Sequence, residues 1–283
     1  MNEPSSLYQD ISYAVNDPVA VITMNRPDAL NAFTTRMLAE IRHALAAAEA
    51  DERVVGIVLT GAGRGFCAGM DMNALNNMSS GKGQQEDLSA LAADPGDDSL
   101  GENFQTAFGF MLSIRKPLIA AVNGACAGLG FVYALLCDMR FVAPEAKFTT
   151  AFAQRGLIAE HGSSWLLPRL VGSGVALDLL WSGRKLDGAE AVSIRLAERL
   201  IEDQPVADAA IDYIKMLAAN SSPTSLRVMK AQVHRHMNMQ FGESLIESNE
   251  WMSASLKRED FKEGVQSFMQ RRPPEFARIK TND

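Results

Sequence analysis

The spacing of hydrophobic and polar positions predicts alternating strands and helices in the first half of the chain. Residues 19–24 form a short β-rich run, and the runs 54–60 and 117–122 are apolar on both faces, as is typical of buried parallel strands. A helix is expected from about Thr34, because apolar side chains then recur at helical spacing up to Leu45.

The same alternation continues to about residue 143. Helices are expected over 104–114 and 131–137, and a strand over 139–143. Residues 76–103 are rich in Ser, Gly, Asp, Gln and Asn, which predicts a mobile surface segment. Strands that alternate with helices favour right-handed crossovers in a largely parallel sheet, so an α/β fold is predicted.

Beyond Gly172 the pattern indicates helices alone. The expected helices cover 175–181, 188–200, 207–219, 224–239, 242–256 and 258–270. We therefore predict an α/β core over residues 1–200 and an all-helical C-terminal region over residues 201–283.

Composition and charge narrow the class of protein. The chain has 283 residues, of which 47% are hydrophobic, so it can form a full core. Its net charge of −7 argues against a nucleic-acid partner held by the overall field. No apolar run approaches the roughly 18 residues that span a membrane. The three cysteines favour buried free thiols in a reducing cytoplasm, and without CxxC or HxxxH pairs no metal site is expected.

Two glycine-rich turns, at 61–69 and 123–130, each follow a predicted buried strand and precede a helix. Glycine lets a ligand approach the backbone closely, and N–H groups at a helix start lack partners. Two such turns on adjacent strands could aim two N–H donors at one oxygen, as in an oxyanion hole for a thioester enolate. The alternative is that the glycines only make tight turns. The first turn lacks a P-loop ending, and the second lacks the dinucleotide-binding register.

The order of these motifs resembles the crotonase superfamily of enoyl-CoA hydratases and isomerases, from about Val19 to Phe276. The motifs are NRPDALNAF, GAGRGFCAGMD, AVNGACAGLG followed by CD, LLPRLVG and FKEGVQSFMQRRPPEF. The resemblance implies a spiral of ββα units with C-terminal helices that build a homotrimer, or a hexamer of two trimers. It also implies an acyl-CoA substrate and no separate cofactor.

The resemblance also implies site residues. The oxyanion donors would be the main-chain N–H groups of Ala68 and Leu129, and Gly128 would contact the substrate. Leu129 stands where many relatives have glycine. Coenzyme A would lie along the first turn, near Arg26, Ala29, Ala68, Asp71 and Met72. Asp71 has an alternative role as the cap of a helix start.

The acidic residues depart from the hydratase pattern. The two hydratase glutamates would fall at Val132 and Phe152, and neither side chain can transfer a proton. Glu160 instead matches the P-E-G stretch of the family's 3-enoyl to 2-enoyl-CoA isomerases, where the glutamate is the single base. Its neighbours Leu157 and Ile158 before it, and residues 165–167 after it, predict an apolar setting, which would disfavour the charged carboxylate. The alternative is that Glu160 caps the following helix.

Other titratable residues have simpler interpretations. His161 could be a second acid or base, but a solvent-facing or locally hydrogen-bonded side chain is favoured. Asp138 is expected to make turn hydrogen bonds, and His234 is expected at the surface.

The function favoured by these residues is isomerisation of 3-enoyl-CoA through Glu160, with hydration of 2-enoyl-CoA as a close rival. Two alternatives remain: a hydrolase or lyase acting on another acyl-CoA, and a catalytically impaired acyl-CoA-binding protein. The acyl group and the pathway are not encoded in these motifs.

Overall fold

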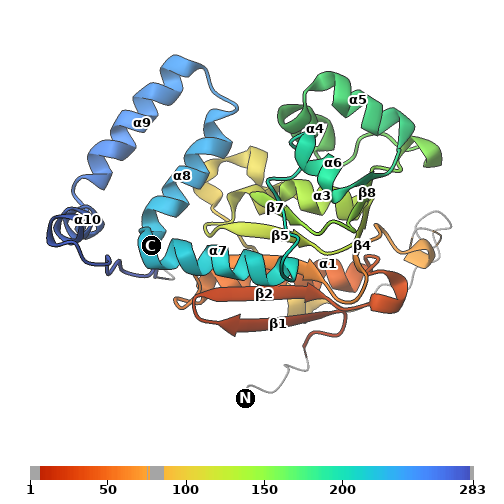
Figure 1. Ribbon diagram of the computed structural model, residues 1–283, viewed down its shortest axis with the longest axis horizontal. Helices are drawn as coiled ribbons and strands as arrows, with labels where there is room; N and C mark the ends of the chain where they lie inside the picture. The colour runs from red at the N-terminus through yellow and green to blue at the C-terminus, as the bar shows by residue number, and fades with distance from the viewer. Residues whose placement is uncertain (1–6, 75, 77–85, 281–283) are drawn as a thin grey trace.

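The computed structural model describes residues 7–74, 76 and 86–280. Its larger sheet has six strands (Figure 1). In spatial order these are β1 (Ile11–Asn16), β2 (Val19–Met24), β3 (Gly56–Gly61), β5 (Leu118–Val122), β7 (Met139–Val142) and β10 (Arg199–Leu200). Only β1 runs antiparallel to its neighbour β2; the other pairs are parallel, as predicted.

A second sheet has four short strands. They are β4 (Gly65–Cys67), β6 (Ala125–Ala127), β8 (Lys147–Thr149) and β9 (Leu186–Asp187). Along the chain β3 is followed by β4, β5 by β6, and β7 by β8, so each turn of the chain gives one strand to each sheet. This is the predicted spiral of ββα units, which the structure confirms.

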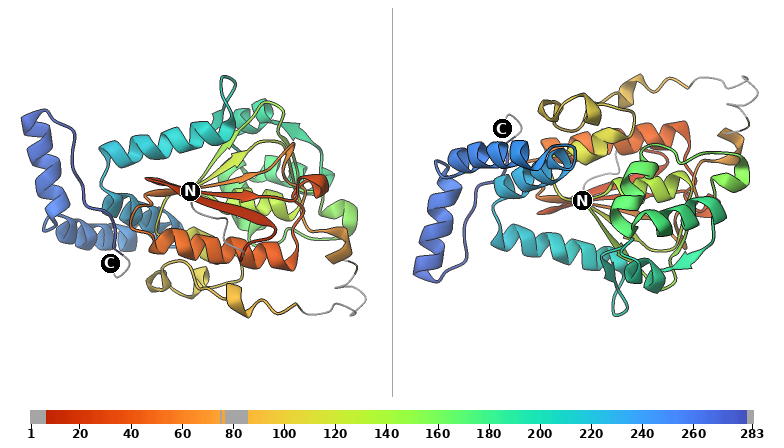
Figure 2. Two further views of the ribbon diagram at one scale, coloured as in Figure 1. Left: turned by 90° about the horizontal axis from the view of Figure 1, so that it is seen from below. Right: turned by 90° about the horizontal axis from the view of Figure 1, so that it is seen from above.

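Helices cover both sheets and extend beyond them. They are α1 (Thr35–Ala50), α3 (Leu129–Leu136), α4 (Ser163–Val171), α5 (Ser173–Ser182), α6 (Gly188–Ser193), α7 (Val206–Asn220), α8 (Pro223–His236), α9 (Phe241–Ser255) and α10 (Glu259–Gln270). Helix α1 begins where predicted, because the Thr34 hydroxyl accepts a hydrogen bond from the Met37 N–H. In Figures 1 and 2, α9 and α10 project away from the sheets.

The two faces of the larger sheet bury different partners. Ile57 and Leu59 belong to the main core, with side chains of α1 and α3. Val58 and Ile119 face the other way and pack against α7. Helix α7 lies in the predicted C-terminal region, yet it contributes to the core.

The helix predicted over 104–114 is wrong. Short 3₁₀ turns form at Glu102–Phe104 and Gly109–Ser113 instead. The Thr106 hydroxyl accepts a hydrogen bond from the Gly109 N–H at 2.9 Å, which competes with a regular helical bond.

The helix predicted over 188–200 is also too long. Helix α6 ends at Ser193, and Arg195 adopts a left-handed backbone with φ 65°. The Leu196 N–H then bonds back to the Ala191 carbonyl, and the chain continues into β10. Burial of Leu196 in the main core favours this turn over a longer helix.

The predicted mobile segment is partly wrong. Residues 77–85 of it lie outside the described residues. Beyond them, Leu91 and Leu100 are buried, and 3₁₀ turns form at Ser89–Leu91 and Asp98–Leu100. A few buried side chains therefore attach residues 86–103 to the protein, while many of the others are exposed, as expected of a surface segment.

Candidate active site

One buried asparagine fastens the first glycine turn. The Asn31 side-chain amide donates to the carbonyls of Ala62 at 3.0 Å and Gly65 at 2.7 Å. Its Oδ1 accepts from the Arg26 N–H at 2.9 Å. Asn31 has a left-handed backbone with φ 57°, which asparagine tolerates. Sequence reasoning missed this residue; the signal was a polar side chain inside the apolar stretch ALNAF.

A second asparagine joins the two glycine turns. Asn123 begins the second turn, and its side-chain amide donates to the carbonyls of Gly63 at 2.9 Å and Gly65 at 3.2 Å in the first. Its Oδ1 accepts from the Gly61 N–H at 3.3 Å. The relative position of the turns is thereby set by side-chain hydrogen bonds as well as by strand pairing.

The two turns also fit together at their glycines. A β-carbon on Gly130 would lie 2.2 Å from the carbonyl oxygen of Cys67, which is impossible without movement. A β-carbon on Gly69 would lie 3.0 Å from the Ala127 oxygen and 3.5 Å from the Leu129 nitrogen. Glycine is thus required for the close approach of the backbones.

The Leu129 N–H lies at the start of α3, where it is available to donate a hydrogen bond to a ligand. Leu129 is the first residue of α3, and Gly128 is the N-cap with φ 53°. The first N–H groups of a helix have no acceptor within the helix, and no described residue accepts from this one. The positive end of the helix dipole adds to its attraction for an anion.

The Ala68 N–H, expected to be the other donor, is already engaged. It donates to the Leu30 carbonyl at 3.0 Å. The Met70 N–H has no acceptor among the described residues. The Phe33 N–H donates to the Gly69 carbonyl at 2.8 Å, and the Phe33 carbonyl accepts from the Asp71 N–H at 2.9 Å, so both bonds go to the neighbours of Met70. The Met70 N–H therefore points away from Phe33.

Arg26 and Asp71 pair beside the first turn. Both Nη atoms of Arg26 lie 3.1 Å from Oδ2 of Asp71, and Nη1 donates to the Ala32 carbonyl at 2.6 Å. Oδ1 of Asp71 accepts from the Asn73 N–H at 2.9 Å, so the capping role is confirmed. Burial acts to raise the pKa of Asp71, but these hydrogen bonds and the Arg26 charge hold it below its usual range.

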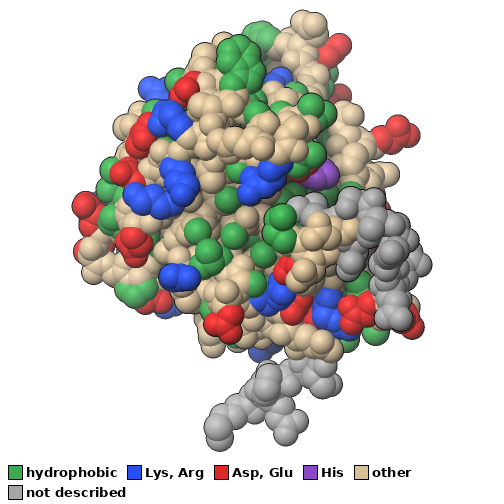
Figure 3. Space-filling view, turned by 90° about the vertical axis from the view of Figure 1, so that its right-hand side faces the viewer, with side chains coloured by type: hydrophobic (Ala, Val, Ile, Leu, Met, Phe, Trp, Pro, Cys, Tyr) green, Lys and Arg blue, Asp and Glu red, His purple; other side chains and the backbone are tan. Residues whose placement is uncertain are grey.

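The remaining residues expected along coenzyme A stay near this turn. The Ala29 N–H bonds to the Arg26 carbonyl at 3.0 Å, and Ala68 is tied to Leu30. Met72 is exposed. On the face shown in Figure 3, hydrophobic side chains are interspersed with both basic and acidic ones.

Glu160 lies in the loop before α4 and does not cap that helix. The N-cap is Gly162, which makes no side-chain hydrogen bond, and only the main-chain carbonyl of Glu160 accepts from the Ser163 N–H, at 2.8 Å. The Glu160 side chain is 28% exposed. Leu157 and Ile158, expected to form part of an apolar setting, are exposed, so that part of the prediction is wrong, whereas Leu166 and Leu167 after it are buried.

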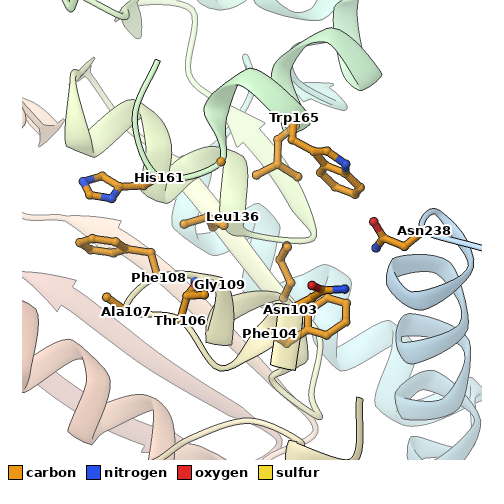
Figure 4. Close-up of a pocket in the computed structure, with 13 residues that line it drawn as sticks. Asn103, Phe104, Thr106, Ala107, Phe108, Gly109, Leu136, His161, Trp165 and Asn238 are labelled. Carbon is orange, nitrogen blue, oxygen red and sulfur yellow. The ribbon is translucent and has the colours of Figure 1, made fainter. Parts of the chain in front are cut away.

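His161 connects Glu160 to α3. Its Nε2 lies 3.9 Å from Oε2 of Glu160, and its ring lies over Phe108, with ring centroids 4.2 Å apart (Figure 4). Phe108 in turn meets the Tyr133 ring of α3 edge-on at 5.8 Å. His161 has a left-handed φ of 47°, a strained conformation that concentrates at functional sites.

The two positions of the hydratase glutamates are apolar and buried. Val132 lies inside α3, and Phe152 follows β8; both belong to the main core. Neither can activate water or deliver a proton.

Asp138 has a structural role. Its Oδ2 accepts from the Leu118 N–H and from Lys230 Nζ, each at 2.7 Å, and its Oδ1 lies 3.2 Å from Nε2 of His234. These contacts anchor α8 to the start of β5. His234, expected at the surface, is largely buried by them.

The cysteines are free and buried, as predicted. Burial raises the pKa of both Cys67 and Cys137 to about 12, so neither is a ready nucleophile. Within the described ranges, no three His, Cys, Asp or Glu side chains gather as metal ligands, and no helix has the length and apolar character to cross a membrane.

Comparisons with known proteins agree on one family. A family model described as enoyl-CoA hydratase/isomerase matches residues 14–279. A 1,2-epoxyphenylacetyl-CoA isomerase of Escherichia coli is 33% identical over 93% of this chain and 96% of its own length. A probable enoyl-CoA hydratase of Bacillus subtilis is 33% identical over 94% of this chain and 98% of its own length. The crystal structure of a putative enoyl-CoA hydratase from Streptomyces coelicolor superposes with a TM-score of 0.82 at 29% identity, covering 97% of this chain and 96% of that one.

Proposed function

The chain belongs to the enoyl-CoA hydratase/isomerase family, and on that basis we propose that it moves a double bond in a coenzyme A thioester. The reaction converts a 3-enoyl-CoA into a 2-enoyl-CoA, with Glu160 as the single base.

The proposed reaction has two proton transfers. The Glu160 carboxylate takes a proton from C2, and the electron pair of that C–H bond moves into an enolate at the thioester oxygen. The protonated Glu160 then gives the proton to C4, and the double bond shifts from C3–C4 to C2–C3. One residue serves both steps, because the carboxyl group returns to its starting state.

Two main-chain donors would hold the enolate oxygen. Leu129 supplies one from the start of α3. For the other we propose Met70 in place of Ala68, because the Ala68 N–H already bonds to Leu30. Such donors favour the enolate over the ground-state carbonyl.

The observation that carries this proposal is the identity of the acids. Of the three positions compared above, only Glu160 bears a carboxylate, whereas Val132 and Phe152 are buried and apolar. The name of the Escherichia coli relative, an isomerase of a coenzyme A thioester, supports isomerase rather than hydratase chemistry.

Hydration is the second candidate. Syn addition of water needs one group to activate water and another to deliver a proton at C2. Beside Glu160 the second group would have to be His161, whose Nε2 is 3.9 Å from the carboxylate. This pair keeps the hydration reaction open as an alternative.

The C-terminal helices support a proposed closed trimer, or a hexamer of two trimers. Helix α9 buries none of its residues, although it carries exposed apolar side chains such as Phe241 and Ile246. On α10, Phe268 is 85% exposed. Apolar surface of this kind marks contacts with another chain. Light scattering at micromolar concentration should give a trimer or hexamer, and a monomer would overturn this proposal.

The function is tested with a panel of thioesters. Purified protein is incubated separately with 3-enoyl-CoA and 2-enoyl-CoA substrates of the same length, and double-bond migration and hydration are both followed. Faster migration supports the proposal, and faster hydration supports the second candidate. No turnover together with a raised Tm on addition of acyl-CoA would support an impaired binding protein.

A further inference from the structure

A cavity of about 440 Å³ opens beside the Glu160 loop (Figure 4). Its walls come from the turns around residues 103–112, from α3, from the start of α4 and from Asn238, two positions beyond the end of α8. We propose that this cavity receives the far end of the acyl group, and that it selects acyl groups ending in an aromatic ring. The inference rests on the proposed function, because it names the substrate class of the same site.

The cavity lies at the C-terminal end of α3, opposite the proposed oxyanion donor at its start. Leu129, the proposed oxyanion donor, begins this helix, and Leu136, which lines the cavity, ends it. Leu136 lies seven positions after Leu129, which corresponds to roughly 10 Å along the helix axis. His161 and Gly162 line the cavity directly after Glu160. An acyl group held at Leu129 and passing Glu160 would therefore reach the cavity with its far end.

Aromatic side chains form three of the walls. Phe104, Phe108 and Trp165 surround the space, and Figure 4 shows Phe108 beneath the His161 ring on one side and Trp165 on another. Aromatic rings pack edge-to-face or offset against one another, which adds to simple apolar burial. A ring of the ligand would gain these contacts, whereas a straight saturated chain would gain burial alone.

The size of the cavity is suited to a ring with a short linker. An engineered cavity of about 150 Å³ in another protein is large enough to bind benzene. The present cavity is larger, and its rim is polar at Asn103, Thr106 and Asn238. The Asn238 amide is held by the His234 carbonyl at 3.2 Å, so its orientation is fixed. A polar substituent on the ligand could contact these rim residues while its ring occupies the apolar interior.

The test compares two substrates that differ only in the ring. These are 5-phenyl-3-pentenoyl-CoA and 3-pentenoyl-CoA, which carry the same 3,4 double bond. We expect kcat/KM for the phenyl substrate to be higher by about tenfold or more, because an aromatic ring is buried. Equal values, or a preference for the pentenoyl substrate, would overturn the inference while leaving the proposed function intact.

A pair of variants locates the effect. Ala107 is exposed and lines the cavity, whereas Gln105 is exposed in the same segment but lies outside the cavity lining. Ala107→Trp should lower kcat/KM for the phenyl substrate at least about fivefold more than for the pentenoyl substrate. Gln105→Trp, which adds the same bulk, should leave the ratio of the two unchanged. Equal loss on both substrates in Ala107→Trp would contradict the assignment.

A binding measurement separates the two proposals. The saturated ligand 5-phenylpentanoyl-CoA cannot isomerise, and its ring should alter the fluorescence of Trp165. The change should disappear in Trp165→Phe and persist in Trp181→Phe, because Trp181 is an exposed residue on α5. If wild type turns over neither enoyl substrate, the proposed function fails, and this measurement still decides the cavity. A signal that survives Trp165→Phe would overturn the inference.

Discussion

The α-carbon of Gly69 lies so close to Leu129 that a β-carbon there would be 3.5 Å from the Leu129 main-chain nitrogen. The same methyl group would lie 3.0 Å from the Ala127 oxygen, so the turn that presents the proposed oxyanion donor would have to shift. We expect Gly69→Ala to lower kcat for isomerisation by about 10²–10³-fold, the loss seen when one such donor is removed.

Gly101 provides the matched control. Gly69 and Gly101 have φ values of 101° and 100°, so alanine is strained equally at both, but nothing lies within 4 Å of a β-carbon on Gly101. Both variants should lose stability through backbone strain, Gly69→Ala more so because its β-carbon would also lie 3.0 Å from the Ala127 oxygen, and only Gly69→Ala should lose activity. Equal activities of the two variants would remove Leu129 from the mechanism.

His161 is expected to position Glu160. Its Nε2 lies 3.9 Å from the carboxylate, and its ring is fixed against Phe108. Asparagine tolerates the left-handed backbone, so His161→Asn should fold normally. The variant should have a lower kcat with an unchanged KM, because the Glu160 carboxylate loses the neighbour that orients it while the substrate contacts remain. An unchanged kcat would show that His161 has only a packing role.

Asp138 should control the attachment of α8. Burial acts to raise the pKa of Asp138, but the charges of Lys230 and His234 hold it below its usual range. The carboxylate therefore stabilises the fold above the unfolded value of about 3.9, and this contribution is lost as the pH falls through the lower folded value. Asp138→Asn should lower the free energy of unfolding at pH 7 by about 3 kcal/mol, because Lys230 and His234 would lose their charged partner.

Denaturant unfolding checks this effect against an exposed ion pair. Asp212 pairs with Lys215 on α7 at 3.5 Å, with both side chains largely exposed. Asp212→Asn should change the free energy of unfolding by less than about 1 kcal/mol. The difference in free energy of unfolding between wild type and Asp138→Asn should narrow as the pH falls below about 3.9, the unfolded value. A difference that is constant with pH would rule out the charge as its cause.

The buried thiols should make the protein sensitive to alkali. Burial raises the pKa of Cys126 well above its ordinary value. The unfolded thiol ionises near pH 8.5, so stability present below that pH is lost as the pH rises. Lys116 acts in the opposite direction, because burial lowers its pKa to about 8. Cys126→Ala should show a smaller fall in Tm between pH 7.5 and pH 9.5 than wild type. An unchanged fall would show that the ionisation of this thiol does not differ between the folded and the unfolded state.

Sequence patterns predicted the repeated elements well, and local chemistry explains why. Apolar runs identified β3 and β5, and Thr34 marked the start of α1. Positions decided by distant contacts were harder to predict. His234 is buried because Asp138, almost a hundred residues away in the chain, lies opposite it.

The candidate site shows the same limit at the scale of single atoms. The glycine motifs located both turns, but they did not show which N–H of the first turn is free. That depends on Leu30 accepting from Ala68, a bond between segments far apart in sequence. Likewise, the apolar residues near Glu160 in the sequence did not reveal that Leu157 and Ile158 are exposed.

The most direct test of the account is to assay double-bond migration and hydration side by side in wild type, Glu160→Gln and the exposed control Glu145→Gln. Glutamine keeps the shape of the side chain and removes the base. We predict that migration falls by about 10²–10⁴-fold in Glu160→Gln, with acyl-CoA binding and the control unchanged. Full retention of both activities in Glu160→Gln would contradict the account, because the proton would then be moved by another group.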